Sequence, residues 1–307
     1  MSILVFGSIN MDLVVRTPRL PARGETLTGS TFSTSPGGKG ANQAVACAKL
    51  GAKTQMIGRV GDDLFGETLL GSLASSGVDA SLVAVDANAA SGVALIAVDD
   101  EAENNIIIVP GANGTIGEKD LPWLEMALDN VGLLLMQLEI PLNMVVAAAE
   151  IARQKKVTTI LDPAPARQLP EDLYPLVDIL TPNETEAAQL VGFPVRTRDQ
   201  VERAAQTLLA RGVKQAIIKL GTQGVYALNN RGGKFYPAIP VTAIDTVAAG
   251  DAFNGALAVA LSEGRTFEEA VQWGLAGGAL AVTKEGAQEA MPDRSELSKL
   301  LGKQNII

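Results

Sequence analysis

Short apolar runs alternate with segments in which apolar residues recur at helical spacing. Beyond residue 130, this pattern predicts strands at residues 131–138, 157–161, 177–180 and 215–220, with helices that include residues 142–154 and 184–190. Strands separated by helices form a parallel, doubly wound sheet that is covered on both faces. The expected fold class is therefore α/β, with a Rossmann-like three-layer αβα sandwich.

Two early segments interrupt this alternation. Residues 12–32 are punctuated by proline and glycine, and residues 91–109 hold two apolar runs on either side of an acidic turn. Both patterns favour β-hairpins over βα units. Inserted hairpins can pair into a small second sheet, and such a sheet beside a ligand site can act as a lid. We expect one domain over residues 1–307, with residues 12–32 and 91–109 forming the lid.

The amino-acid composition limits the kinds of catalytic site that the chain can form. The chain has 307 residues, 47% of them hydrophobic, which is enough to bury a large core. It contains no histidine, and this excludes Ser-His-Asp and Cys-His catalysis as well as HExxH zinc sites. Carboxylates are then the candidate acid and base groups near neutral pH. The one cysteine, Cys47, excludes an intrachain disulfide and is expected in the core.

Net charge and the first residues bear on partners and location. The formal net charge of −9 argues against general affinity for nucleic acid or an anionic membrane, because both require a basic surface. The first residues have neither a basic flank nor a long apolar run, so we expect no signal peptide and no membrane span. We expect a cytoplasmic protein.

The common nucleotide-binding signatures are missing from the sequence. The chain has no GxxxxGK[ST] motif, and its one GxG, from Gly38 to Gly40, has Gln43 where a dinucleotide fingerprint needs glycine. A P-loop enzyme is thereby excluded, and a dehydrogenase is disfavoured.

A first glycine-rich motif occupies residues 36–42, before a helix expected at residues 43–50. Its glycines allow the backbone to approach a ligand closely, while Lys39 and Asn42 supply polar groups suited to hydroxyls. The alternative is an ordinary tight turn that precedes a helix.

A second motif of small residues covers residues 245–251 and also precedes a helix. The N–H groups of Ala248, Ala249 and Gly250 are expected to be accessible at the helix N-terminus, where an anion such as phosphate is favoured. Asp251 either complements this helix end as a cap or serves as a base. A carboxylate beside an anion site makes chemical sense if it takes a proton from a hydroxyl that attacks phosphorus.

Six segments together resemble the ribokinase family of carbohydrate kinases over essentially the whole chain. They are GSINMD at residues 7–12, GET at 24–26, GGKGANQA at 37–44, PAPAR at 163–167, TPNETE at 181–186 and DTVAAGDAFN at 245–254. The resemblance implies ATP-dependent phosphorylation of the terminal (5-) hydroxyl of D-ribose, in a homodimer paired through its lids. Open alternatives are a kinase for another small sugar, a nucleoside or a sugar phosphate, and a sugar-sensing protein without catalysis.

The resemblance also implies roles for individual residues, with Asp251 as the base on the sugar hydroxyl. The sugar-binding candidates are Asn10, Met11, Asp12, Gly38, Lys39, Gly40, Ala41, Asn42, Glu139 and Asp251. The nucleotide-binding candidates are Asn183, Glu186, Lys219, Leu220, Gly221, Thr222, Gln223, Gly224, Gly250 and Leu275.

Two of these assignments have alternatives. Glu139 could be a solvated carboxylate, although it follows a buried strand at the end where open α/β sheets bind ligands. Asn183 and Glu186 would organise Mg²⁺ around the phosphates, but their spacing is equally that of a helix cap. Leu275 departs from the polar residue that relatives often present to adenine, which leaves base selectivity open.

By resemblance, a monovalent cation, K⁺, is expected between residues 245–247 and residues 281–290. The candidate ligands are the Asp245 carboxylate and the carbonyls of Val247, Ala281, Lys284 and Gly286. Ala290 stands where many relatives have serine, so one hydroxyl ligand is missing. The alternative for Asp245 is a turn residue that bonds its own backbone.

Overall fold

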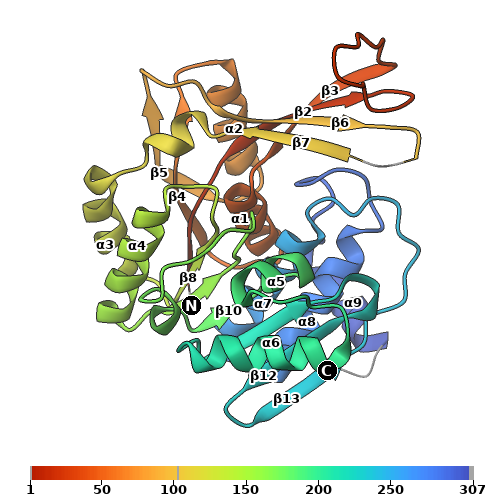
Figure 1. Ribbon diagram of the computed structural model, residues 1–307. Coiled ribbons are helices and arrows are strands. Elements are labelled where there is room, and N and C mark those ends of the chain that lie inside the picture. The colour runs from red at the N-terminus through yellow and green to blue at the C-terminus, as the bar shows by residue number, and fades with distance from the viewer. Residues whose placement is uncertain (1, 102–103, 304–307) are drawn as a thin grey trace.

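The computed structural model describes residues 2–101 and 104–303 and has two sheets (Figure 1). The large sheet has the strand order β13-β12-β11-β10-β9-β8-β1-β4-β5. Its strands are β1 (Ile3–Phe6), β4 (Thr54–Gly61), β5 (Asp79–Asp86), β8 (Leu133–Met136), β9 (Thr158–Leu161), β10 (Ile179–Leu180), β11 (Gln215–Lys219), β12 (Val225–Asn229) and β13 (Gly232–Tyr236).

Helices cover both faces of this sheet. They are α1 (Lys39–Lys49), α2 (Leu64–Ser75), α3 (Leu121–Leu128), α4 (Leu142–Lys155), α5 (Glu184–Val191), α6 (Arg198–Ala210), α7 (Ala249–Ser262), α8 (Phe267–Ala281) and α9 (Arg294–Lys303). Short 3₁₀ turns occupy Gly111–Thr115, Glu118–Asp120, Tyr174–Leu176 and Gly221–Gln223. No helix in the described part of the chain has both the length and the apolar character needed to cross a membrane.

The sheet separates two hydrophobic cores. In β1, Ile3 and Val5 face a core shared with α1, α2, α7, α8 and α9, whereas Leu4 and Phe6 face a core shared with α3, α4, α5 and α6. This alternation follows from the two-residue period of a strand, and because both faces are covered the strand is apolar throughout. The predicted three-layer sandwich is confirmed.

One edge of the large sheet differs from the prediction of a parallel sheet. Strands β4, β1, β8, β9, β10 and β11 pair in parallel, but β11–β12 and β12–β13 are antiparallel. Only Asn230 and Arg231 connect β12 to β13. A connection this short can join antiparallel strands only, because parallel strands need a long crossover.

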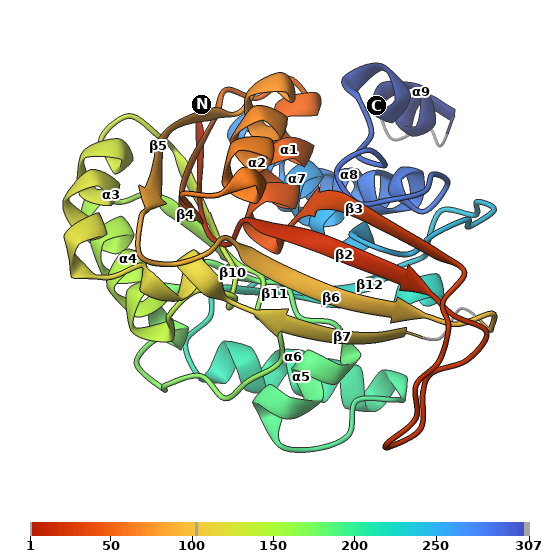
Figure 2. The same cartoon turned by 90° about the horizontal axis from the view of Figure 1, so that it is seen from above.

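The small sheet combines the two predicted hairpins. Strands β2 (Asn10–Arg16) and β3 (Thr31–Gly37) are antiparallel, as are β6 (Gly92–Val98) and β7 (Asn104–Val109), and β2 pairs with β6 in parallel. The first hairpin is longer than expected, since it begins before residue 12 and ends after residue 32. The small sheet stands out from the large one beside α2 (Figures 1 and 2).

Candidate active site

The start of α1 packs directly on the loop after β1. Gly38 has φ 87°, and a Cβ added there would lie 2.6 Å from the backbone nitrogen of Asn10. A Cβ on Gly40 would lie 2.6 Å from the nitrogen of Ser8. These glycines let α1 begin at Lys39, four residues earlier than predicted, so the motif residues from Lys39 to Asn42 form the first helical turn instead of a loop.

Glu139 lies just beyond β8 and is held by groups from the loop after β1, from β2 and from α1. Its Oε2 accepts hydrogen bonds from Ser8 Oγ at 2.6 Å, Lys39 N at 3.2 Å and Asn10 Nδ2 at 3.4 Å. A carboxylate with these donors is not the freely solvated group of the alternative interpretation. The Asn10 amide is oriented in turn by Asn113, whose Nδ2 donates to Asn10 Oδ1 at 2.8 Å.

Asp251 is buried in the first turn of α7, with 4% of its surface exposed. Its Oδ1 accepts a hydrogen bond from Gln43 Nε2 at 3.0 Å, and its Oδ2 accepts one from Asn42 Nδ2 at 3.0 Å. The capping residue of α7 is Ala248, which has φ 56°, so Asp251 is not the helix cap, although it lies in the first turn, where a carboxylate complements the helix dipole. Burial raises the pKa of Asp251, while the positive charge of Lys39 opposes that rise.

Asp12 lies in β2 and faces the same group of acidic side chains. Burial raises its pKa to about 7, helped by the negative charges of Glu139 and Asp251 and opposed by Lys39. A Cβ on Gly37 of the paired strand β3 would collide with the Asp12 carboxylate. Glycine at that position therefore makes room for this side chain.

Among the predicted nucleotide residues, Asn183, Glu186 and residues 219–224 lie at or just beyond the ends of β10 and β11, whereas Gly250 lies in α7 and Leu275 in α8. Asn183 caps α5: its Oδ1 accepts from Glu186 N at 2.8 Å, while its own N and Nδ2 donate to the Glu186 carboxylate at 2.7 and 2.8 Å. The capping alternative is thus confirmed as a structural role. Asn183 also pairs with Lys219 in an isolated parallel bridge. Beyond Lys219, the turn at residues 221–223 is exposed, whereas Leu220 and Gly224 are buried.

These residues are compatible with Mg²⁺. The described part of the chain has no group of three or more His, Cys, Asp or Glu side chains arranged as metal ligands. Kinases, however, hold Mg²⁺ through one or two carboxylates together with the phosphates of the substrate and water. Burial raises the pKa of Glu186, and Lys219 opposes this rise, so Glu186 is a buried carboxyl group with cationic neighbours. A carboxylate is a donor type that Mg²⁺ takes, so the chemistry of Glu186 fits the metal.

The turn before α7 carries the predicted anion donors. Ala248 adopts a left-handed conformation, and the N–H of Ala249 makes only a long hydrogen bond of 3.4 Å to the carbonyl of Thr246. A Cβ added at Gly250 would lie 3.4 Å from Lys219 Nζ. The turn and this ammonium group are therefore neighbours.

The two loops of the predicted cation site are in contact. Asp245 Oδ1 accepts from Val247 N at 3.0 Å and Oδ2 accepts from Gly286 N at 3.1 Å. The Ala281 carbonyl accepts from Lys284 N at 3.2 Å, and Ala290 is fully buried. The bond to Val247 is the turn interaction that was the alternative for Asp245. The bond to Gly286 is an additional contact, which joins the two loops.

Leu275 lies on α8, partly buried, and packs against the core on that face of the sheet.

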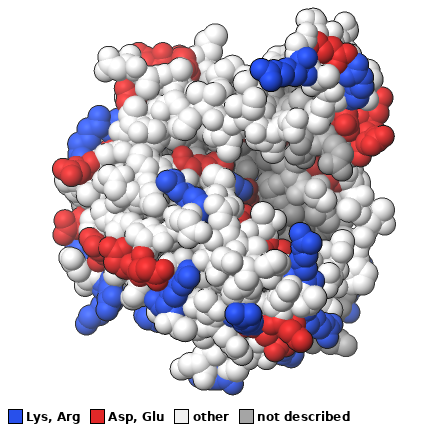
Figure 3. All heavy atoms as spheres, viewed as in Figure 1, with Lys and Arg blue, Asp and Glu red and all other residues white. Residues whose placement is uncertain are grey.

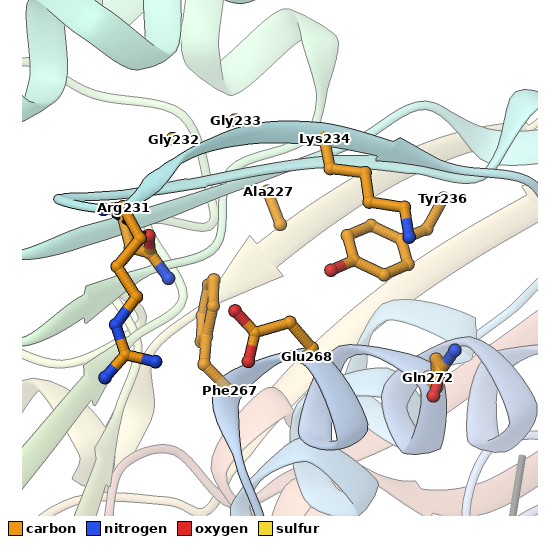
Figure 4. A pocket seen from close by; sticks show the side chains of 10 residues that line it. Ala227, Arg231, Gly232, Gly233, Lys234, Tyr236, Phe267, Glu268 and Gln272 are labelled. Carbon is orange, nitrogen blue, oxygen red and sulfur yellow. Dashed lines mark hydrogen bonds between the residues drawn. The ribbon is translucent and has the colours of Figure 1, made fainter.

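A separate cavity of about 280 Å³ lies farther toward the start of α8, against the β12–β13 hairpin. Figure 4 shows Phe267 and Glu268 of α8 facing the hairpin there, with Lys234 over Tyr236. None of the predicted site residues lines this cavity. Figure 3 shows a hollow below the small sheet in which acidic and basic atoms gather.

The sequence interpretation missed several residues that organise the site. Asp162 follows β9 and is 1% exposed, so the strand-end criterion applied to Glu139 would also have found it. Gln43 is fully buried and contacts Asp251, but glutamine in an apolar helix gave no signal. Asn113 and Ser8 are joined to the site only by tertiary contacts.

Comparisons with known proteins cover nearly the whole chain. A family model described as pfkB family carbohydrate kinase matches residues 1–294. Ribokinase of Haemophilus influenzae is 41% identical over 300 residues, with 98% of each chain covered. Deoxyribokinase of Salmonella typhi is 36% identical, with 98% of this chain and 99% of the relative covered. The solved structure of Arabidopsis thaliana ribokinase complexed with ribose and ATP has a TM-score of 0.90 at 36% identity, with 98% of each chain covered.

Proposed function

Because this chain belongs to the pfkB family of carbohydrate kinases, we propose that it is a ribokinase, which transfers the γ-phosphoryl group of ATP to the 5-hydroxyl of D-ribose. The observation that carries this proposal is Asp251. This buried carboxylate is held by two amide donors, beside the turn that carries the predicted anion donors and next to the candidate sugar residues. A sugar-binding protein without catalysis would have no use for such a group.

In the proposed reaction, Asp251 takes the proton of the 5-hydroxyl as that oxygen bonds to the γ-phosphorus. The bond between this phosphorus and the bridging oxygen breaks, and ADP leaves with the electron pair. The N–H groups at residues 248–250 stabilise negative charge on the transferred group. Asn42 Oδ1 is buried and has no partner among the described residues, so it is suited to accept a hydrogen bond from a sugar hydroxyl.

ATP would lie along the exposed turn at residues 221–223, with its phosphates toward Gly250 and Lys219. Glu186 and Asn183 would hold Mg²⁺ and its waters, and the metal supplies neutralisation of the triphosphate charge. The small sheet would close over the sugar, since Asn10 and Asp12 belong to its strand β2. Closure would keep water from intercepting the phosphoryl group.

The small sheet also supports the proposed homodimer. Ile106, Ile107, Val109 and Leu95 are 53%, 62%, 47% and 43% exposed. Exposed apolar residues on an edge strand and its neighbour favour pairing with another chain. A second copy that covers this sheet would pair the two lids, and light scattering would measure the mass in solution.

The test of the proposed activity is an ATP-consumption screen over ribose, deoxyribose, fructose, adenosine and fructose phosphates. Ribose is expected to give the highest kcat/KM, with NMR placing the phosphate on the 5-oxygen. Preference for deoxyribose would favour the activity of the Salmonella relative. If none of these compounds is phosphorylated, the assignment is wrong.

The KM for the sugar is expected to rise as pH falls below about 7, because Asp12 has a pKa of about 7 and should bind sugar hydroxyls as a carboxylate. Protonation removes the negative charge with which Asp12 accepts hydrogen bonds, so affinity for the sugar is lost on the acid side. Steady-state kinetics from pH 5.5 to 8.5 would measure it, with the KM for ATP as the internal control. Asp12→Asn should show a high sugar KM without this pH dependence. A sugar KM that is flat in the wild-type protein would contradict this role.

K⁺ is expected to raise kcat without contacting either substrate. A cation beside Asp245 and the carbonyls of Val247, Ala281, Lys284 and Gly286 would fix the adjacent turn and its N–H groups toward the phosphate. The assay compares KCl with a bulky salt at equal ionic strength. Ala290→Ser should lower the K⁺ concentration for half-activation by adding a hydroxyl ligand. Equal rates with and without K⁺ at saturating substrates would exclude the site.

A further inference from the structure

Two buried side chains, Gln43 and Asp162, lie between Asp251 and Lys219 at the centre of the site. Gln43 Nε2 is 3.0 Å from Asp251 Oδ1 and also 3.0 Å from Asp162 Oδ2. Gln137 Nε2 donates to Gln43 Oε1 at 2.7 Å, which fixes the orientation of the Gln43 amide. Gln43 and Gln137 are fully buried, and Asp162 is 1% exposed. One neutral amide thus joins two buried carboxylates that would otherwise repel each other.

The other carboxylate oxygen of Asp162 forms an ion pair with Lys219. Lys219 Nζ donates to Asp162 Oδ1 at 2.8 Å, and the two side chains are 14% and 2% exposed. The same ammonium nitrogen lies 3.4 Å from the position of a Cβ at Gly250, in the turn proposed to bind the phosphate. A continuous series of hydrogen bonds therefore runs from Asp251 through Gln43 and Asp162 to Lys219.

We infer that Asp162 and Gln43 are positioning residues that hold the base Asp251 and the ammonium of Lys219 on two sides of the transferred phosphoryl group. This inference rests on the proposed function. Lys219 contributes a positive charge where the oxygens of the group in transfer are negative, and a donor fixed in advance costs no reorganisation during the reaction. Asp162 keeps that donor in place, and Gln43 sets its separation from the base.

A solely structural role makes a different prediction. If the Asp162–Lys219 pair served stability alone, losing one partner would lower the melting temperature, because an unpaired charge would remain buried. Losing both charges would then restore stability and activity together. A positioning role predicts instead that kcat stays low after stability has been restored.

The first test is Gln43→Met, with kinetics measured well below the melting temperature. We expect kcat to fall about 10- to 100-fold, as for loss of hydrogen bonds to charged groups, with both KM values within about twofold of wild type. Gln55→Met is the matched control, because Gln55 Nε2 makes a similar 3.0 Å bond to Asp79 Oδ2 away from the site. Its kcat should not change. A wild-type kcat in Gln43→Met would overturn the inference.

The second test compares Asp162→Asn, Lys219→Met and the double variant, and it remains informative if Gln43→Met does not fold. We expect the melting temperature to fall in each single variant and to recover in the double variant, while kcat stays at least about tenfold low in Lys219→Met and in the double variant. Recovery of both quantities would overturn the inference. The proposed function fails separately, if wild type phosphorylates no sugar or Asp251→Asn remains active.

Discussion

Replacing Asp251 by asparagine is expected to lower kcat by about 10²- to 10⁴-fold while sugar and ATP still bind. Asparagine keeps the size of the side chain and one of the two oxygens that accept hydrogen bonds from Asn42 and Gln43, but it cannot take up the hydroxyl proton. Residue 251 is only 4% exposed, so a water molecule has little access to act as the base in place of the carboxylate. The effect should therefore appear in kcat and leave the dissociation constants of both substrates nearly unchanged.

Turnover of Asp251→Asn would be followed by ADP release, and binding by calorimetry. Asp199→Asn is the matched control, because Asp199 also lies in the first turn of a helix but is exposed on α6. Its kcat should equal that of wild type. Near wild-type turnover of Asp251→Asn would show that another group accepts the proton.

Replacing Arg59 by methionine is expected to lower the free energy of unfolding by about 3–5 kcal/mol, the range for breaking a buried ion pair. Arg59 lies in β4 and is 5% exposed. Its Nε and Nη2 donate to the Asp120 carboxylate at 3.2 and 2.6 Å, and its Nη1 donates to Asp86 Oδ2 at 3.3 Å. The substitution would leave two buried carboxylates without their cation.

Urea unfolding would measure the loss in Arg59→Met. Arg19→Met is the control, since Arg19 pairs with Glu25 at an exposed position and exposed pairs contribute little. Its unfolding midpoint should match that of wild type. Equal midpoints for all three proteins would show that the Arg59 cluster does not stabilise the fold. Because the hydrogen bonds of Arg59 go to Asp86 and Asp120, and not to a predicted sugar residue, folded Arg59→Met should keep its kcat.

The sequence by itself determined the fold class and indicated which residue types the candidate site offers. Apolar runs between helical segments specify a covered sheet, because an apolar strand is stable only with both faces buried. The absence of histidine left carboxylates as acid and base groups. The motifs at residues 36–42 and 245–251 supplied residue types suited to the proposed hydroxyl site and the proposed anion site. These are properties of local segments, which a linear pattern can carry.

Only the tertiary structure decided which of these groups meet. Asn42 and Gln43 are more than 200 residues from Asp251 along the chain, yet both donate to its carboxylate because α1 packs on α7. The same packing decided that Asp251 is a buried acceptor and not a helix cap. Asp162 became part of the site because the strand order places the end of β9 near the end of β11, where Lys219 lies. Hydrogen bonds between distant segments depend on this packing and leave no periodic signal in the sequence.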